Sequence, residues 1–259
     1  MPTHITYESM ENVFIQDRPD HVPSAEQIPE RFGLVANDWP DVAKMNSSAG
    51  PNVKYKLLFI ARHGEGVHNA ASRKFGKEVH HWAYLEGDEE LKWGPDPELV
   101  ELGAQQARMA HEAWRKYSPP EPQTLYSSPL RRALQTCSIT FPGGRRSCSR
   151  CDIRELVTGF SCDYRLPNST VASVYPQHDF SRIFSENDPY AGLRETHEQL
   201  HERVKKVVDG IFESDDSHVI SITAHGDWMK TASGILGRKK YRIPTGGAVA
   251  FLIKATFTN

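Results

Sequence analysis

The chain of 259 residues has 38% hydrophobic and 25% charged side chains, a mixture typical of an ordinary globular protein. Its formal net charge of -2 argues against a general binder of nucleic acid or of membrane surfaces. No apolar run approaches the roughly 18 residues of a membrane span, and the acidic N-terminus does not resemble a secretory signal. We therefore expect a cytoplasmic protein without nucleic-acid or membrane partners.

Residues 1–52 show little periodicity and are rich in Pro, Asp and Asn. Their large apolar side chains, among them Phe32, Trp39 and Met45, are too numerous for a disordered segment. We expect these residues to form an irregular N-terminal arm that packs on a main domain of residues 53–259.

From residue 55 onward, apolar runs alternate with helical patterns. Strands are predicted at residues 55–61, 123–128, 151–157, 218–224 and 246–257. Helices are predicted at residues 69–76, 97–118, 130–141, 194–214 and 227–237. This alternation favours an α/β fold, a three-layer sandwich in which helices flank a mostly parallel central sheet.

Polar groups come directly after three of the predicted strands. They are Arg62 with His63, the segment Ser-Ser-Pro-Leu-Arg-Arg at 127–132, and His225. In α/β sheets ligands bind beyond the carboxyl ends of the strands, and paired arginines match the oxygens of a phosphate. A histidine beside that phosphate can attack phosphorus, the arginines can hold the transferred group, and a carboxylic acid can protonate the leaving oxygen. Each motif alone is also compatible with a solvated loop, whereas their joint occurrence in this order favours a phosphate site.

Three motifs resemble those of the histidine phosphatase superfamily, also called the phosphoglycerate mutase-like family. "RHGEGVHN" resembles its first signature, "SSPLRRALQT" its second and "ITAHGDWM" its third. The stretch "IRELVTGFSCDYR" makes the chain most similar to the phosphomutase-like proteins of fungi and plants. The resemblance runs from about residue 55 to the C-terminus and implies a phosphoglycerate mutase-like fold.

Carried over residue by residue, the resemblance implies that His63 is the nucleophile and becomes phosphohistidine. Arg62, Arg132 and the catalytic His225 would bind the phosphoryl group, with Asn69 as a supporting ligand. Arg132 matches the motif arginine better than its neighbour, because it directly precedes the motif alanine.

The resemblance leaves two glutamates as candidates for the proton donor. Glu155 is the better match, and Glu65 is its rival, with contact to the substrate or to a neighbouring site residue as its other role. Asp163 and Arg165 match a stretch where substrate contact is expected, although a local ion pair between them is an equal alternative. Val100 stands where relatives often carry a threonine that caps a helix, so capping differs there.

An aromatic and acidic insert at residues 77–96 and the segment 163–180 are expected to shape the substrate pocket. His80 and His81 in this insert are adjacent, so their side chains diverge, which is unfavourable for metal binding. Cys148 and Cys151 form a CxxC without a second ligand pair, and the other two cysteines are Cys137 and Cys162. We expect no metal, no cofactor and no structural disulfide.

The function we expect is hydrolysis of the phosphoric monoester of a small metabolite through a phosphohistidine. A phosphoglycerate-type mutase is less favoured, because the acidic insert lacks the basic residues that would hold a doubly anionic substrate. A third alternative is a pocket recruited to non-phosphoryl chemistry on a carboxylated or other metabolite, since arginines and histidines also bind carboxylates.

Overall fold

The computed structural model describes residues 4–18, 21, 27–76, 85–143, 147–239 and 242–258. Its strands are β1 (His4–Ser9), β2 (Val53–Arg62), β3 (Thr124–Ser127), β4 (Ser147–Ser149), β5 (His178–Asp179), β6 (Val219–Ala224) and β7 (Ala248–Thr258). Its α-helices are α1 (Val42–Ser47), α2 (Val67–Phe75), α4 (Glu101–Tyr117), α5 (Arg131–Thr140), α6 (Asn168–Val174), α7 (His197–Ser214) and α8 (Gly226–Ile235). Short 3₁₀ turns lie at Ile15–Asp17, Glu30–Gly33, Cys151–Ile153 and Ser161–Asp163.

The strands form one mixed sheet in the order β1-β7-β2-β6-β3-β4-β5. Strands β2, β6, β3, β4 and β5 are mutually parallel, whereas β7 runs antiparallel to both β1 and β2. Arg62 of β2 is level with Ala224 of β6, and Ser127 of β3 is level with Thr223. This register brings the polar residues at the ends of these three strands to one edge of the sheet.

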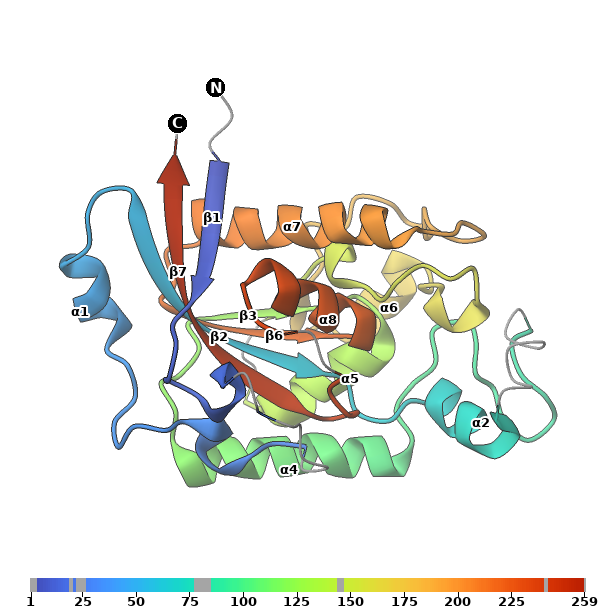
Figure 1. Ribbon diagram of the computed structural model, residues 1–259. Helices are drawn as coiled ribbons and strands as arrows, with labels where there is room; N and C mark the ends of the chain where they lie inside the picture. Colours follow the sequence, from blue (N-terminus) through green and yellow to red (C-terminus); the bar gives the residue numbers. More distant parts are fainter. Residues whose placement is uncertain are drawn as a thin grey trace.

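Helices cover both faces of the sheet, with α7 and α8 on one side and α4 and α5 on the other (Figure 1). Helix α7 buries one apolar stripe, as its spacing predicts, against the first face. On the other face, the aromatic residues of α4 and of the N-terminal segment contact Leu57 and Phe59. The predicted three-layer α/β sandwich with a mostly parallel sheet is confirmed.

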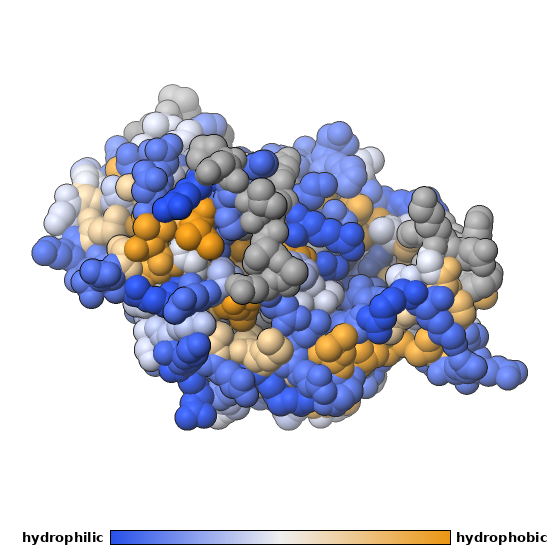
Figure 2. Space-filling model, turned by 60° about the horizontal axis from the view of Figure 1, so that its bottom comes forward, coloured by the Kyte–Doolittle hydropathy of each residue, from blue (hydrophilic) through white to orange (hydrophobic). Residues whose placement is uncertain are grey.

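The outer surface on the α4 side is mostly hydrophilic and is interrupted by separate apolar patches (Figure 2). Such a surface is usual for a helix that packs on a core through one stripe only. Helix α4 begins after Val100, whose side chain makes no capping hydrogen bond. No helix in the described part of the chain is both long and apolar enough to cross a membrane.

The segment before residue 53 is more ordered than the irregular arm that its sequence indicates. Strand β1 pairs with β7 from His4 opposite Thr258 to Ser9 opposite Ile253, so this segment supplies an edge strand of the sheet. Phe32 is fully buried and its ring contacts those of Trp39, Phe59 and Trp114. This segment therefore contacts the rest of the sheet through a strand that local periodicity does not show.

The prediction of a strand at residues 151–157 is wrong. Strand β4 ends at Ser149, and the chain continues as a 3₁₀ turn, Cys151–Ile153, and a non-strand segment. The physical reason lies in the main-chain acceptors. The carbonyls of Asp152, Arg154 and Glu155 accept hydrogen bonds from the side chain of Arg203 instead of pairing with a strand.

Candidate active site

His63 lies directly after β2 and is 1% exposed. Its Nδ1 lies 2.6 Å from the carbonyl oxygen of Gly64. Because a carbonyl can only accept, Nδ1 carries the proton and Nε2 keeps its lone pair. Burial, followed by the charges of Arg132 and Arg62, lowers the pKa of His63 well below its ordinary value. The ring is therefore a neutral imidazole whose Nε2 has a free lone pair.

The loop after His63 is held by α4 and α5. The amide of Gly64 donates to Oγ1 of Thr136 at 2.9 Å, and the amide of Glu65 donates to Oε1 of Gln106 at 2.8 Å. The loop lies so close to α4 that a Cβ on Gly64 would reach within 3.0 Å of the Cα of Gly103. Glycine is therefore required on both sides of this contact.

Two buried arginines border the histidine. Nη1 of Arg62 donates to the carbonyl of Ile243 at 2.9 Å, and Nη1 of Arg132 donates to the carbonyl of Cys162 at 2.7 Å. The Nε atoms of both arginines are buried and have no hydrogen-bond partner within the described ranges. Unsatisfied buried donors are costly, which is consistent with a pocket that an anion completes.

His225 precedes α8 and lies against His63, with the two ring centroids 4.9 Å apart. This is the convergence that the sequence motifs predict. Nε2 of His225 lies 2.7 Å from Oγ of Ser128, and its buried Nδ1 has no partner within the described ranges. Burial and the charge of Arg132 lower the pKa of His225 well below its ordinary value.

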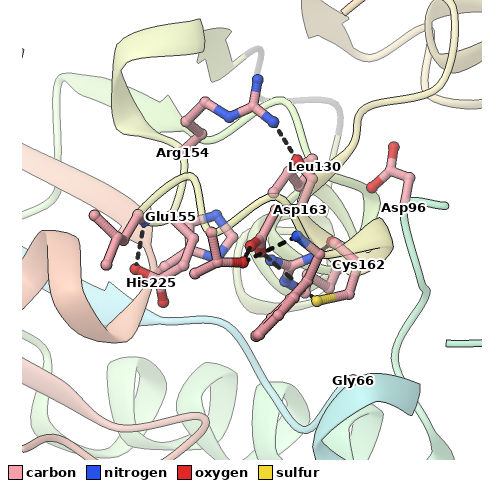
Figure 3. A network of polar contacts seen from close by, with 12 residues as sticks. Gly66, Asp96, Leu130, Arg154, Glu155, Cys162, Asp163 and His225 are labelled. Carbon is pink, nitrogen blue, oxygen red and sulfur yellow. Dashed lines mark hydrogen bonds and ion pairs between the residues drawn. The ribbon is translucent and has the colours of Figure 1, made fainter. Parts of the chain in front are cut away.

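Glu155 contributes a carboxyl group at the same edge. Its Oε1 accepts from its neighbour Leu156 and from the amide of Asp227 in the first turn of α8, at 3.0 Å each. Burial, then the carboxylates of Asp227 and Asp163, raise the pKa of Glu155 above its ordinary value. Figure 3 shows Glu155, Asp163 and His225 within one polar network. A carboxyl group with a raised pKa suits a general acid better than one with an ordinary pKa.

Asp163 and Arg165 do not form the local ion pair that their spacing allows. Oδ1 of Asp163 lies 3.6 Å from Nη2 of Arg132, and burial raises the pKa of the Asp163 carboxyl. Arg165 instead donates to backbone carbonyls of residues 166 and 185–187. Its guanidinium is thus committed to a loop, which differs from the substrate contact expected for it. The described residues contain no ion pair between the two side chains.

Asn69 and Glu65 also make contacts that the motif alone does not reveal. Oδ1 of Asn69 accepts from the amide of Gly66 at 3.0 Å, so this side chain caps the start of α2 where a phosphate contact was expected. Oε1 of Glu65 pairs with Arg73, and its buried Oε2 has no partner within the described ranges. Glu155 differs from Glu65 in its partners, because its carboxyl group accepts from the amide of Asp227 at the start of α8.

His68 is a site residue that the sequence motifs did not single out. Its ring centroid lies 5.5 Å from that of His63, and Arg132, His63 and Arg62 add to the burial that lowers its pKa. The imidazole occupies the space beside Gly66, where a Cβ would lie 2.8 Å from its Nδ1. The signal in the sequence was its place in the first motif, directly before Asn69.

The neighbouring Arg131 turns away from this cluster. Its Nε donates to the carbonyl of Asp96 at 2.7 Å, and its Nη1 pairs with Glu98 at 2.9 Å. Burial raises the pKa of Asp96 to about 6. Arg131 thus fastens the end of the insert to α5, while Arg132 enters the pocket.

His80 and His81 and the rest of 77–84 lie outside the described residues. In the described remainder of the insert, Trp93 is buried against Ala71 of α2, and the carbonyl of Leu85 accepts from Ser161. This part of the insert therefore packs on two segments that border the site. Within the described ranges, no group of three His, Cys, Asp or Glu side chains is arranged to hold a metal ion. The four cysteines form no disulfide bond.

Comparison with known proteins agrees with the motifs. The family model of the histidine phosphatase superfamily, branch 1, matches residues 58–243. A probable phosphoglycerate mutase of Arthroderma benhamiae is 30% identical over 284 aligned positions, which cover 96% of this chain and 84% of that protein. Phosphomutase-like protein 3 of Candida albicans is 28% identical, with 95% and 79% of the two chains covered.

Among solved structures, an ecdysone phosphate phosphatase from Bombix mori in complex with tungstate is similar in fold. Its TM-score is 0.52 at 18% identity, and the superposition covers 75% of this chain and 88% of that chain. The fold, the motifs and the family match agree. The chain belongs to the histidine phosphatase superfamily, branch 1.

Proposed function

We propose that this protein hydrolyses the phosphoric monoester of a small metabolite through a phosphohistidine on His63. The observation that carries the proposal is the hydrogen bond from Nδ1 of His63 to the Gly64 carbonyl, which leaves Nε2 as the free nucleophile. Arg62, Arg132 and His225 surround this ring. Together they supply cationic and neutral donors for a phosphoryl group in transit.

In the first step, Nε2 of His63 attacks phosphorus and a P–N bond forms while the P–O bond to the leaving group breaks. The leaving oxygen takes the proton of the Glu155 carboxyl, so an alcohol departs and a carboxylate remains. The arginine donors hold the oxygens of the transferred phosphoryl group.

In the second step, a water molecule attacks the phosphohistidine and its P–N bond breaks. The Glu155 carboxylate takes the proton of that water, which restores the acid and releases inorganic phosphate. Each group thus returns to its initial state, and these two steps need no metal ion.

Hydrolysis is favoured over a mutase reaction by the charge of the insert. Residues 86–92 carry four carboxylates and one lysine, a poor match for a substrate with a second anionic group. The distinction is open to direct measurement, because a mutase returns the phosphoryl group to an organic product. We also propose a cytoplasmic location, since the composition is that of an ordinary globular protein.

The test combines turnover with trapping of the intermediate. With chelator present, the wild-type protein should release phosphate from a panel of monoesters, and rapid acid-free denaturation should trap phosphohistidine on His63. His63→Ala should abolish both, whereas His201→Ala, which removes an exposed histidine of α7, should change neither. Isomerised phosphate ester without free phosphate would establish a mutase. Absence of turnover with every ester would favour non-phosphoryl chemistry.

A further inference from the structure

Arg203 of α7 makes an unusually complete set of hydrogen bonds to the chain around Glu155. It is 9% exposed, and it donates to the carbonyls of Asp152 at 2.8 Å, Arg154 at 3.0 Å and Glu155 at 3.1 Å. A single guanidinium therefore fixes the main chain on both sides of the proposed acid. Its planar fork suits this task, which a lysine ammonium cannot reproduce.

Glu195 completes the arrangement from the loop before α7. Its Oε1 and Oε2 accept from Nε and Nη2 of Arg203 at 2.8 and 2.6 Å. The amide of Glu195 also donates to the carbonyl of Val157 at 2.8 Å, and the amide of Val157 donates to Oε2 of Glu195 at 3.3 Å. The pair thus holds the segment from residue 152 to residue 157 at both ends.

This segment lacks the ladder of hydrogen bonds that a strand would give it. With its main chain held, Glu155 directs its carboxyl group to the amide of Asp227 at the start of α8. We infer that Arg203 and Glu195 are positioning residues that place the Glu155 carboxyl over the leaving oxygen. The inference rests on the proposed function, because it takes Glu155 as the proton donor.

The ion pair of Arg203 with Glu195 also sets the net charge near the Glu155 carboxyl group. The bidentate contact with Glu195 neutralises the guanidinium, so Arg203 can touch the main chain of Glu155 without presenting an uncompensated positive charge to its carboxyl. A free guanidinium at this place would stabilise the carboxylate and lower its pKa. The clamp of Arg203 and Glu195 therefore combines firm positioning with a carboxyl group whose pKa stays raised.

Glu195→Gln tests the charge, because it preserves shape and leaves Arg203 uncompensated. For an alkyl phosphate, the alkaline limb of the kcat profile should move down by about one pH unit, the order of magnitude expected when one unpaired charge lies near a buried carboxyl group. The double variant Arg203→Met/Glu195→Gln removes both charges, and its limb should return to the wild-type position. Asp17→Asn is the matched control, since it removes the carboxylate from another buried arginine pair, that of Asp17 with Arg238 beside β1.

Arg203→Lys tests the positioning, because it keeps the charge but loses the fork. Its kcat should fall about tenfold to a hundredfold for the alkyl phosphate and less than threefold for p-nitrophenyl phosphate, whose leaving group needs no proton. Thermal unfolding should confirm that each variant is folded under assay conditions. Equal losses for both esters, together with identical pH limbs for Glu195→Gln and Asp17→Asn, would overturn the inference.

Glu155→Gln, measured alongside, separates this inference from the proposed function. If that variant shows no difference between the two esters, Glu155 is not the acid and the positioning inference fails, while hydrolysis through His63 stands as long as the wild type releases phosphate and forms phosphohistidine. If it shows the difference while the clamp variants do not, only the positioning role of Arg203 and Glu195 is refuted.

Discussion

Gly103 of α4 offers a sharp test of how the reactive loop is supported. In an open helix, alanine is more favourable than glycine by about 1 kcal/mol. A Cβ at residue 103, however, would lie 2.7 Å from the amide nitrogen of Glu65 and closer still to its carbonyl oxygen. These are backbone atoms two residues beyond His63, so they cannot swing aside as a flexible side chain would.

The size of the effect depends on that distance. Cβ atoms are essentially never found nearer than 3.0 Å to such atoms, so the loop or the helix must move. Overpacking of this kind typically costs about 1–3 kcal/mol, which outweighs the gain in helix propensity. A shift of about 1 Å at a reactive residue costs about a hundredfold in rate. We expect Gly103→Ala to lose up to ~2 kcal/mol of stability and about a hundredfold in kcat.

Gly210→Ala on α7 is the matched control, because nothing lies within 4 Å of its added Cβ. That variant should gain about 0.5–1 kcal/mol and keep full activity. Urea unfolding and steady-state kinetics on p-nitrophenyl phosphate measure both quantities. Should Gly103→Ala prove as active and as stable as Gly210→Ala, the close contact between α4 and the reactive loop would be refuted.

Three further predictions concern the N-terminal segment, His68 and a loop anchor. Phe32→Ala should cost about 3–5 kcal/mol in urea unfolding, because the ring is fully buried among aromatic neighbours; a loss below about 1 kcal/mol would contradict this. The pKa of His68 in the folded protein lies well below ~6.5, its value in the unfolded chain. The contribution of His68 to the free energy of unfolding is therefore lost as the pH falls below ~6.5. His68→Gln should reduce the slope of unfolding free energy between about pH 6.5 and 5 by up to ~1.4 kcal/mol per pH unit, and an unchanged slope would refute this. Arg165→Met should lower the Tm while KM stays within about threefold of wild type, because its guanidinium binds loop carbonyls; a large rise in KM at an unchanged Tm would restore the substrate contact.

The sequence by itself predicted the family, the layers of the fold and the convergence of His63 with His225. These features are readable because they depend on local patterns. A continuous apolar run predicts a buried strand, and parallel strands bring the residues at their carboxyl ends to one edge of the sheet. The choice of Arg132 over Arg131 was equally readable, and the structure shows the latter directed toward Asp96 and Glu98.

Only the tertiary structure decided the features that depend on distant partners. Strand β1 exists because β7, at the other end of the chain, offers an unpaired edge. The segment around Glu155 fails to become a strand because the guanidinium of Arg203, far along the chain, takes its carbonyls. The side chains of Asn69 and Arg165 likewise form hydrogen bonds with main-chain groups, and any ligand would compete with those groups for the two side chains. Main-chain acceptors are identical in every residue, so sequence periodicity carries no information about which distant donor will bind them.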